Sequence, residues 1–249
     1  MTANLPDKDD SGKEEGRDYV TALARGLDVM RAFRDQESRL TLSDVARIVG
    51  LPRASVRRAL FTLETLGYVE TQGRYFALTP QVLTLAQAYL SSSPVPRVAQ
   101  NFLERVSETL GQSCSLSILH ETEVIYIARS ARKRIGSLHR DVGTHLPAHC
   151  TSMGRVLLAA LPASEFAGYL AKAELTAFTR FTLTDKDGLR QAVEKAGRQG
   201  YSLVDQELEM DLRSIATPIC NASGRVIAAL NVGARASLDR KSTRLNSSH

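Results

Sequence analysis

The short segment RASVRR is rich in arginine and contains Arg53, Arg57 and Arg58. A planar guanidinium group donates two parallel hydrogen bonds, which match either a phosphate group or the O6 and N7 atoms of guanine. These residue types therefore favour recognition of nucleic acid as the chemistry of this segment. An ordinary surface helix that carries arginines is the alternative.

The arginines belong to a predicted helix that follows Pro52. Apolar residues at helical spacing form its back, and arginines and smaller residues form its front. A packed back with an arginine-rich front near the N-terminus is typical of the second helix of a helix-turn-helix unit, which enters the DNA major groove. The back consists of Val56, Ala59, Leu60, Leu63 and Leu66, and the front of Ala54, Arg57, Arg58, Phe61 and Thr65, with Arg53 at the N-terminal end.

A shorter helix is predicted just before it, from Thr41 to Gly50. Thr41 is suited to cap the N-terminus, and Asp44 three residues later forms a short version of the capping box. Gly50 ends this helix, and Pro52 suits the first turn of the next. Residues 18–33 predict another amphipathic helix, which would pack across the two as the third member of a small bundle.

A β-hairpin is predicted directly after the arginine-bearing helix. Residues 68–70 and 75–78 have strand character, and the turn between them contains Gly73. This position fits the wing of a winged helix, where Arg74 would reach backbone phosphate or the minor groove; a solvated turn arginine is the alternative. The residues that we expect to contact double-stranded DNA are Thr41, Arg53, Ala54, Ser55, Arg57, Arg58 and Arg74.

The composition agrees with a globular protein that meets an anionic partner. Of the 249 residues 43% are hydrophobic and 24% charged, which is ordinary for a folded domain. The net charge of +5 favours encounter with a polyanion but does not prove it. No apolar run approaches the roughly 20 residues needed to span a membrane, and the N-terminus has no signal-peptide core. We therefore expect a soluble, cytoplasmic protein with no membrane partner.

Signals for catalysis and metal binding are absent from the sequence. Cys114, Cys150 and Cys220 are far apart and form no CxxC pair, which disfavours a disulfide framework and a zinc site. The GxSxG, HExxH, Walker and GxGxxG motifs do not occur, and the histidines lack metal-ligand spacing. We expect no enzymatic activity and no cofactor.

The rest of the chain predicts a second domain with a mixed architecture. Residues 80–90 read as a helix, and the Ser- and Pro-rich segment 91–96 as a domain boundary. Helices and strands then alternate in groups, which predicts an α+β domain around a mainly antiparallel sheet. The predicted helices are 97–110, 151–161, one from about 163, and 185–199, and the predicted strands are 114–120, 124–129, 136–139, 201–204, 213–220 and 225–232.

Long segments of the sequence resemble IclR-family transcriptional regulators, over roughly residues 18–240. The first domain carries LTLSDVARIVGLPRASVRRALFTLETLGYV, and the second carries VGTHLPAHCTSMGRVLLAAL and GYSLVDQELEMDLRSIATPICNASGRVIAALNV. In sequence, these segments are most similar to the branch of the family that controls aromatic catabolism, namely the protocatechuate, 4-hydroxybenzoate and β-ketoadipate regulators.

The resemblance implies a winged helix that binds operator DNA as a homodimer or homotetramer. It also implies a GAF-like domain that binds a small organic acid on one side of its sheet. A helix that starts near Thr151 suits a carboxylate, because its free N–H groups and its dipole favour an anion. By position, the implied effector-binding residues are Ile135 and Leu138 as wall, Ser152 and Met153 at the helix rim, and Leu212, Ser214, Asn231 and Gly233 on the facing strands. In some relatives small hydroxyl residues stand at the last two positions, so hydrogen bonding to the ligand would differ here.

Other charged residues of the second domain have ordinary explanations beside functional ones. The acidic residues Asp205, Glu207 and Glu209 are interpreted as a solvated loop. A basic group at the end of a predicted strand would attract an anionic effector, or would be exposed without such a role. For His149 and Cys150 we favour packing over ligation. The basic group consists of Arg129, Arg132, Lys133 and Arg134.

Together these features predict a ligand-responsive, DNA-binding transcriptional regulator of a catabolic operon for aromatic or related small organic acids. A winged-helix module for protein contacts and dimerisation, without specific DNA binding, is the alternative. The expected regions are a disordered arm (1–17), the winged helix-turn-helix (18–79), a linker helix and hinge (80–96), the effector domain (97–240) and a non-native tail (241–249). The tail is polar and aperiodic where the family has another amphipathic helix.

Overall fold

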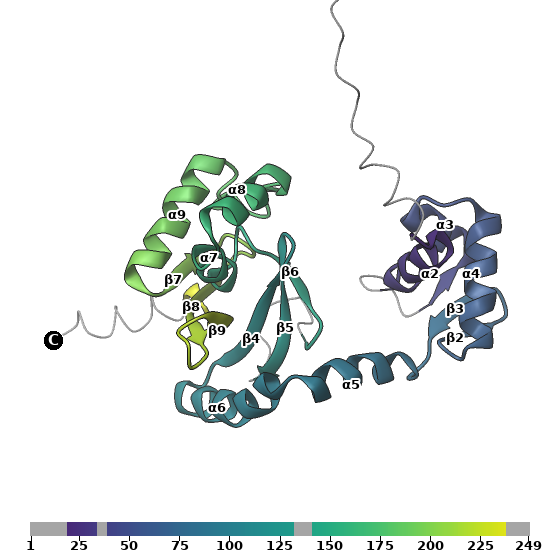
Figure 1. Ribbon diagram of the computed structural model, residues 1–249, viewed down its shortest axis with the longest axis horizontal. Coiled ribbons are helices and arrows are strands. Elements are labelled where there is room, and N and C mark those ends of the chain that lie inside the picture. Colours follow the sequence, from purple (N-terminus) through teal and green to yellow (C-terminus); the bar gives the residue numbers. More distant parts are fainter. Residues whose placement is uncertain (1–18, 34–38, 132–140, 238–249) are drawn as a thin grey trace, which may run out of the picture. The chain divides into compact units, whose positions relative to one another are not determined.

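The computed structural model describes residues 19–33, 39–131 and 141–237 (Figure 1). The arm 1–17, the tail 241–249 and the strand expected at 136–139 lie outside these ranges. The chain divides into two compact units, residues 1–89 and 90–249. Within the described ranges no helix has the length and apolar character needed to cross a lipid bilayer.

The first unit is a three-helix bundle with a small antiparallel sheet. Its apolar core joins all three helices and the first residue of the hairpin, through side chains such as Val29, Val45, Val56, Leu60 and Val69. The strand order is β1-β3-β2. The elements are α2 (Thr21–Arg31), β1 (Leu40–Thr41), α3 (Leu42–Val49), α4 (Arg53–Thr65), β2 (Val69–Gln72) and β3 (Tyr75–Leu78).

Local sequence signals set the ends of α3. The Thr41 hydroxyl accepts from the backbone N–H of Asp44, and the Asp44 carboxylate accepts from the backbone N–H of Thr41 at 3.0 Å, so the predicted capping box is present. Gly50 adopts a left-handed conformation with φ of 65° and ends the helix. The three residues from Gly50 to Pro52 then join α3 to α4, as in a helix-turn-helix unit.

Two features of this unit differ from the prediction. Leu66, which the periodicity predicts on the packed back of α4, is 59% exposed, because the helix ends at Thr65 and the chain turns away there. The short strand β1 was not predicted; Leu40 pairs with Phe76 of the hairpin. A segment of two residues is too short to show the alternation that predicts a strand. This pairing therefore depends on the tertiary fold.

The connection between the units is helical for longer than expected. Helix α5 (Val82–Ser92) is followed by α6 (Pro94–Leu110), with Ser93 as the N-cap of α6. Apart from Ser93, the segment 91–96 is therefore helical and is not an extended linker. Proline is compatible with the first turn of a helix, because the N–H that it lacks would have no partner there.

In the described part of the second unit, six strands form one antiparallel sheet in the order β6-β5-β4-β9-β8-β7. Every pair of neighbours is antiparallel, which confirms the predicted α+β class. The strand β6 was not predicted. The strands are β4 (Ser113–His120), β5 (Glu123–Ser130), β6 (His145–Pro147), β7 (Ser202–Asp205), β8 (Leu212–Cys220) and β9 (Val226–Arg235).

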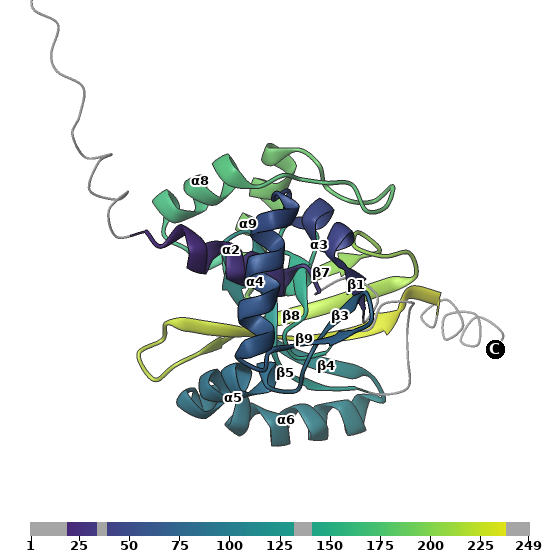
Figure 2. The ribbon, with the colours of Figure 1, turned by 90° about the vertical axis from the view of Figure 1, so that its right-hand side faces the viewer.

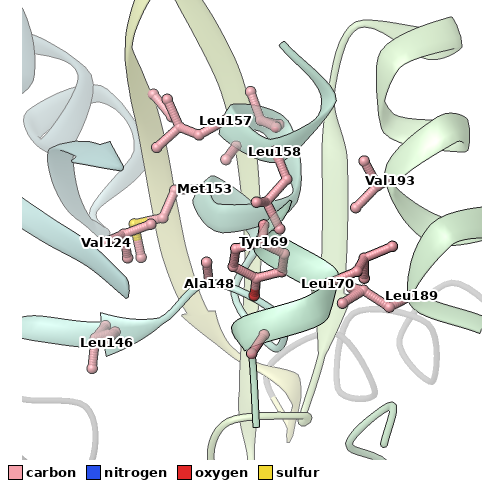
Figure 3. Packing of buried hydrophobic residues seen from close by; sticks show 14 of the residues in the cluster. Val124, Leu146, Ala148, Met153, Leu157, Leu158, Tyr169, Leu170, Leu189 and Val193 are labelled. Atoms are coloured by element: carbon pink, nitrogen blue, oxygen red, sulfur yellow. The ribbon is translucent and has the colours of Figure 1, made fainter. Parts of the chain in front are cut away.

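Helices cover both faces of this sheet. Figure 2 shows α6 below the strands, and α8 (Ala163–Lys172) and α9 (Lys186–Gln199) above them. Helix α7 (Ser152–Ala159) packs directly on the upper face, where Met153 reaches toward Val124 of β5 and Leu158 lies near Val193 of α9 (Figure 3). On the other face, Leu103 of α6 packs on Cys114 and Leu116 of β4.

Gly154 allows α7 to approach the chain that precedes it. A Cβ at this position would lie 2.1 Å from the carbonyl oxygen of Ala148, which is far inside van der Waals contact. The obstacle is backbone and cannot rotate away. The glycine in the TSMG segment therefore has a packing reason, which is to let the first turn of α7 sit against residues 148–150.

Candidate functional site

Helix α4 presents the arginine face that the sequence predicts. Arg53, Ala54, Arg57 and Arg58 are exposed, while Val56 and Leu60 on the opposite face are buried. No ion pair within the described ranges engages Arg53, Arg57 or Arg58. Phe61 extends the same face and is 69% exposed. This face is therefore free to meet a large anionic partner.

The other residues expected to contact DNA are placed less uniformly. The Thr41 hydroxyl is engaged in the cap of α3, where it donates to the Asp44 carboxylate at 2.6 Å. Ser55 is half-buried in the first turn of α4. Both residues have local structural roles. Only those of their atoms that the cap and the turn do not engage would be available to contact DNA.

Arg74 lies at the tip of the hairpin, in a two-residue turn with Gly73, whose φ is 64°. Its guanidinium donates to the Tyr75 hydroxyl at 2.9 Å and stacks over the Tyr75 ring at 5.1 Å. This contact orients the arginine without neutralising it. The exposed, positively charged wing tip is thus compatible with a phosphate contact.

The residues expected to bind an effector cluster where α7 meets the sheet. Thr151 caps α7 by accepting from the backbone N–H of Gly154 at 3.2 Å. Next to it, the Ser152 hydroxyl donates to the Ser214 hydroxyl of β8 at 2.9 Å. The first turn of the helix is therefore tied to the facing strand.

Strand pairing brings the other predicted residues together. Gly233 of β9 pairs with Ser214, and a Cβ on Gly233 would contact Leu212 at 3.7 Å. Asn231, two residues earlier, points to the same face and is 6% exposed. Met153 belongs to the hydrophobic core and is fully packed. Ile135 and Leu138 lie outside the described residues.

Sequence reasoning missed two polar residues on the same face of the sheet, Ser115 and Ser117. Ser115 of β4 pairs with Asn231 on one side and with Arg129 of β5 on the other, so the three side chains form one row. Ser117 belongs to the next row, beside Tyr126 of β5. The alternation of serine with apolar residues from Cys114 to Ile118 was the available signal, because it marks a polar face on a buried strand.

Three polar atoms on this face are buried and have no hydrogen-bond partner among the described residues. They are Nε of Arg129, Oγ of Ser117 and Oδ1 of Asn231. Leaving a polar atom unpaired in the interior costs about 1–3 kcal/mol, so folded proteins rarely retain several together without an ordered water or a ligand. The interpretation of Arg129 as an exposed strand-end cation is wrong, since its side chain is half-buried. Arg132, Lys133 and Arg134 lie outside the described residues.

The interpretation of Glu207 as part of a solvated acidic loop is wrong, because its side chain is buried, whereas Asp205 and Glu209 are only partly buried. Glu207 is buried and accepts from Nη2 of Arg155 at 2.6 Å, and Asp205 accepts from Arg213 at 2.8 Å. The partner of Arg155 is more than 50 residues away in the sequence. The helical periodicity of α7 therefore could not predict this pair. The pair sits beside the first turn of α7 and fixes it against the end of β7.

His149 and Cys150 are packed, as favoured by the sequence. His149 bonds the Thr176 carbonyl through Nε2 at 3.1 Å. Burial lowers its pKa below the ordinary value, and this hydrogen bond opposes the shift. Burial raises the pKa of the Cys150 thiol to about 12, so it is protonated at neutral pH. The described residues contain no group of His, Cys, Asp or Glu side chains that could hold a metal ion.

An open groove of about 1190 Å³ lies at the C-terminal end of α7, where Leu157 and Ala160 line it together with the β4–β5 turn, α8 and the β8–β9 turn. Its charged lining is mixed, with Glu121 and Glu165 beside Lys172 and Arg225. It shares no residue with the predicted effector set. The unpaired polar atoms of Arg129, Ser117 and Asn231 lie outside the lining of this groove and favour the part of the sheet near the N-terminus of α7 as the ligand site.

Two family models match the chain, one over each compact unit. The IclR helix-turn-helix domain matches residues 22–73, and the bacterial transcriptional regulator IclR C-terminal family matches residues 87–245. The chain is 47% identical over 216 residues to the Pca regulon regulatory protein of Pseudomonas putida, covering 86% of this chain and 74% of that protein. It is 37% identical over 219 residues to the p-hydroxybenzoate hydroxylase transcriptional activator of Acinetobacter baylyi, covering 86% and 81%.

A solved structure shows the same architecture. The fold resembles an IclR homologue from Microbacterium hydrocarbonoxydans in complex with 4-hydroxybenzoate, with a TM-score of 0.73 and 28% identity over 86% of this chain and 89% of that one. The family matches cover the arginine face of α4 and the α7 face of the sheet. The chain therefore belongs to the IclR family of bacterial transcriptional regulators.

Proposed function

We propose that this chain binds operator DNA through α4 and the β2–β3 wing, and that a small aromatic carboxylic acid bound in the second unit adjusts its DNA affinity. The observation that carries the DNA-binding part is the exposed face of Arg53, Arg57 and Arg58, which no acidic side chain of the described residues neutralises. Arginines at the start of a recognition helix reach base edges and phosphates in the major groove.

The effector class is supported by two relatives. One is named as the transcriptional activator for p-hydroxybenzoate hydroxylase, and the other was solved in complex with 4-hydroxybenzoate. The buried polar atoms on the α7 face of the sheet suit a small ligand with polar groups. Binding at this site would change DNA affinity through a coupling free energy between the two sites, and DNA would change effector affinity by the same factor.

The proposal includes a homodimer or homotetramer acting in the cytoplasm. Helix α5 exposes Leu83, Leu85 and Tyr89, and none of its residues is buried within one chain. An exposed apolar helix is suited to association between copies. A dimer would present two recognition helices to two half-sites.

The experiment is a fluorescence anisotropy titration. DNA fragments selected by the full-length protein from a random pool are titrated at several salt concentrations, with and without 4-hydroxybenzoate, protocatechuate or β-ketoadipate. A selected sequence should bind with a steep salt dependence, because arginines displace counterions from phosphates. One acid should change the affinity. Enrichment of no sequence would instead favour the protein-interaction module.

A further inference from the structure

Phe61 of α4 is the most exposed large apolar side chain in the described part of the chain, at 69%. It belongs neither to the apolar core of the first unit nor to the partly buried side chains that pack against this core. Packing within one chain therefore gives no reason for a phenylalanine at this position. Single exposed apolar residues are common on protein surfaces, so the groups around the ring decide its interpretation.

The ring lies on the face of α4 that carries the free arginines. Residues three and four apart share one face of a helix, so Phe61 is the neighbour of Arg58 and Arg57, one turn nearer the C-terminus. No cation–π contact among the described residues joins the ring to either arginine. On the C-terminal side, the Thr65 hydroxyl donates to the Phe61 carbonyl at 2.8 Å and is thereby engaged. The exposed face therefore combines cations with one open aromatic ring.

A second copy of the chain is one partner that could cover the ring. Contacts between copies are usually twofold and join the same patch on both subunits. A twofold contact through this face would bring Arg57 and Arg58 against their own counterparts, and like charges in a desolvated contact are unfavourable. Helix α5 offers an exposed apolar surface without this penalty, because it carries no charged residue. The charge of the α4 face therefore favours a polyanion as the partner.

DNA supplies groups for both parts of this face. Its phosphates match the arginines, and each thymine presents an apolar C5-methyl group in the major groove. Phenylalanine is among the side chains that make apolar contact with this methyl group. Aromatic wedges that separate base steps are typical of proteins that bind the minor groove, whereas a recognition helix lies in the major groove. A methyl contact is therefore the chemistry that fits the ring.

We propose that Phe61 contacts the C5-methyl group of a thymine in the operator and makes this base pair part of the recognised sequence. The inference rests on the proposed function and deepens it, because it adds a base-specific apolar contact to the arginine contacts. Phe61 lies four residues after Arg57, which is roughly 6 Å along the helix axis. At a base-pair spacing of about 3.4 Å, the thymine should lie within about three base pairs of the position that Arg57 contacts.

Fluorescence anisotropy with the full-length chain tests this contact through single changes in the DNA. In an operator selected from the random pool, each thymine in turn is replaced by uracil, which lacks the methyl group and keeps the same hydrogen-bonding groups. One replacement in each half-site should weaken binding about fourfold, the effect of losing one buried methyl contact. Phe61→Ala should bind the unmodified operator roughly tenfold more weakly and should show no further loss when that thymine becomes uracil.

The matched control is Phe181→Ala, because Phe181 is also exposed and lies in the second unit. It should bind every duplex as the wild type does. A wild type that is insensitive to every uracil, or a Phe61→Ala variant that keeps the uracil sensitivity, overturns the inference and leaves the proposed function standing. A Phe61→Ala variant with a changed subunit number in sedimentation equilibrium and unchanged operator affinity also overturns it, and assigns the ring to a contact between copies. Enrichment of no sequence in the selection overturns both.

A second measurement needs only the wild-type protein and therefore does not depend on the folding of a variant. The uracil-sensitive thymine is replaced by 5-iodouracil, which carries iodine in place of the methyl group and couples under ultraviolet light to an aromatic side chain in contact with it. Mass spectrometry should locate the cross-link on Phe61, within the tryptic peptide 59–74. A cross-link to any other residue overturns the assignment.

Discussion

Nη2 of Arg155 lies 2.6 Å from Oε2 of Glu207, and both side chains are buried. Arg155 lies on α7, and Glu207 lies just beyond the end of β7. The same carboxylate oxygen accepts from the backbone N–H of Leu183 at 3.1 Å, and Nε of Arg155 donates to the His149 carbonyl. This pair therefore joins four segments at the end of α7 that faces the proposed effector.

Arg155→Met should destabilise the second unit by about 3–5 kcal/mol, because it leaves the Glu207 carboxylate buried without its counter-charge. The double variant Arg155→Met with Glu207→Leu should recover most of this loss, since no unpaired charge remains. Urea unfolding followed by far-ultraviolet circular dichroism measures both. A double variant that is less stable than the single one would mean that the pair stabilises through more than charge compensation.

Gly154→Ala should cost about 2–3 kcal/mol, since the new methyl group overlaps the Ala148 backbone and α7 must move. Gly168→Ala is the matched control, because Gly168 lies in α8 with nothing within 4 Å of the added Cβ. That change should be neutral or stabilising by up to about 1 kcal/mol, through the better helix propensity of alanine. Similar midpoints of thermal unfolding for the two variants would contradict the close approach.

His149 should make stability depend on pH. Because burial lowers its folded-state pKa below 6.5, the unfolded chain binds more protons than the folded chain between the two pKa values. Stability should therefore fall as pH is lowered through 6.5 toward the folded-state pKa, and this contribution should be constant above about pH 7.5. His149→Gln keeps a donor for the Thr176 carbonyl and should lose less stability between pH 7.5 and 5. Parallel pH profiles for variant and wild type would refute this assignment.

Arg57→Ala and Arg58→Ala should each weaken binding to the selected operator while the thermal midpoint stays unchanged, because both side chains are exposed. If an arginine contacts a phosphate, its loss should reduce the slope of log affinity against log salt by about 1 and affect all sequences alike. If it contacts a base, the loss should relax specificity at one position. Arg198→Ala serves as the exposed control. Unchanged operator affinity in both variants would exclude α4 as the recognition helix.

Thr41→Ala should cost about 1 kcal/mol, because it removes the N-cap of α3. Thr41→Ser keeps the hydroxyl and should retain most of the stability. Urea unfolding of the two variants measures the contribution of the cap to stability, and operator titration of the same variants measures the expected DNA contact. A Thr41→Ser variant that is stable but binds operator weakly would show that the methyl group, or its fit against DNA, also matters.

Much of the fold could be predicted because its signals are local. The capping box of Thr41 and Asp44, the left-handed Gly50 and the packed face of α4 depend on residues within one or two turns. Strands β4 and β5 and helix α9 also fall close to their predicted ranges. The short strands β1 and β6 could not be predicted, since two or three residues show no period and form only against a distant partner.

The sequence by itself determined the arginine face of α4 and the order of the elements, because helical and strand periodicities place neighbouring residues on known faces. Only the tertiary structure decided which polar residues meet. Arg129, Ser115 and Asn231 come from three strands, and Arg155 meets Glu207 across a helix and a strand end. Such contacts depend on sheet register and on burial, and neither is encoded by spacing along the chain. For the same reason the sequence alone suggests that Glu207 and Arg129 are solvated charges, whereas in the structure Glu207 is buried and Arg129 is half-buried.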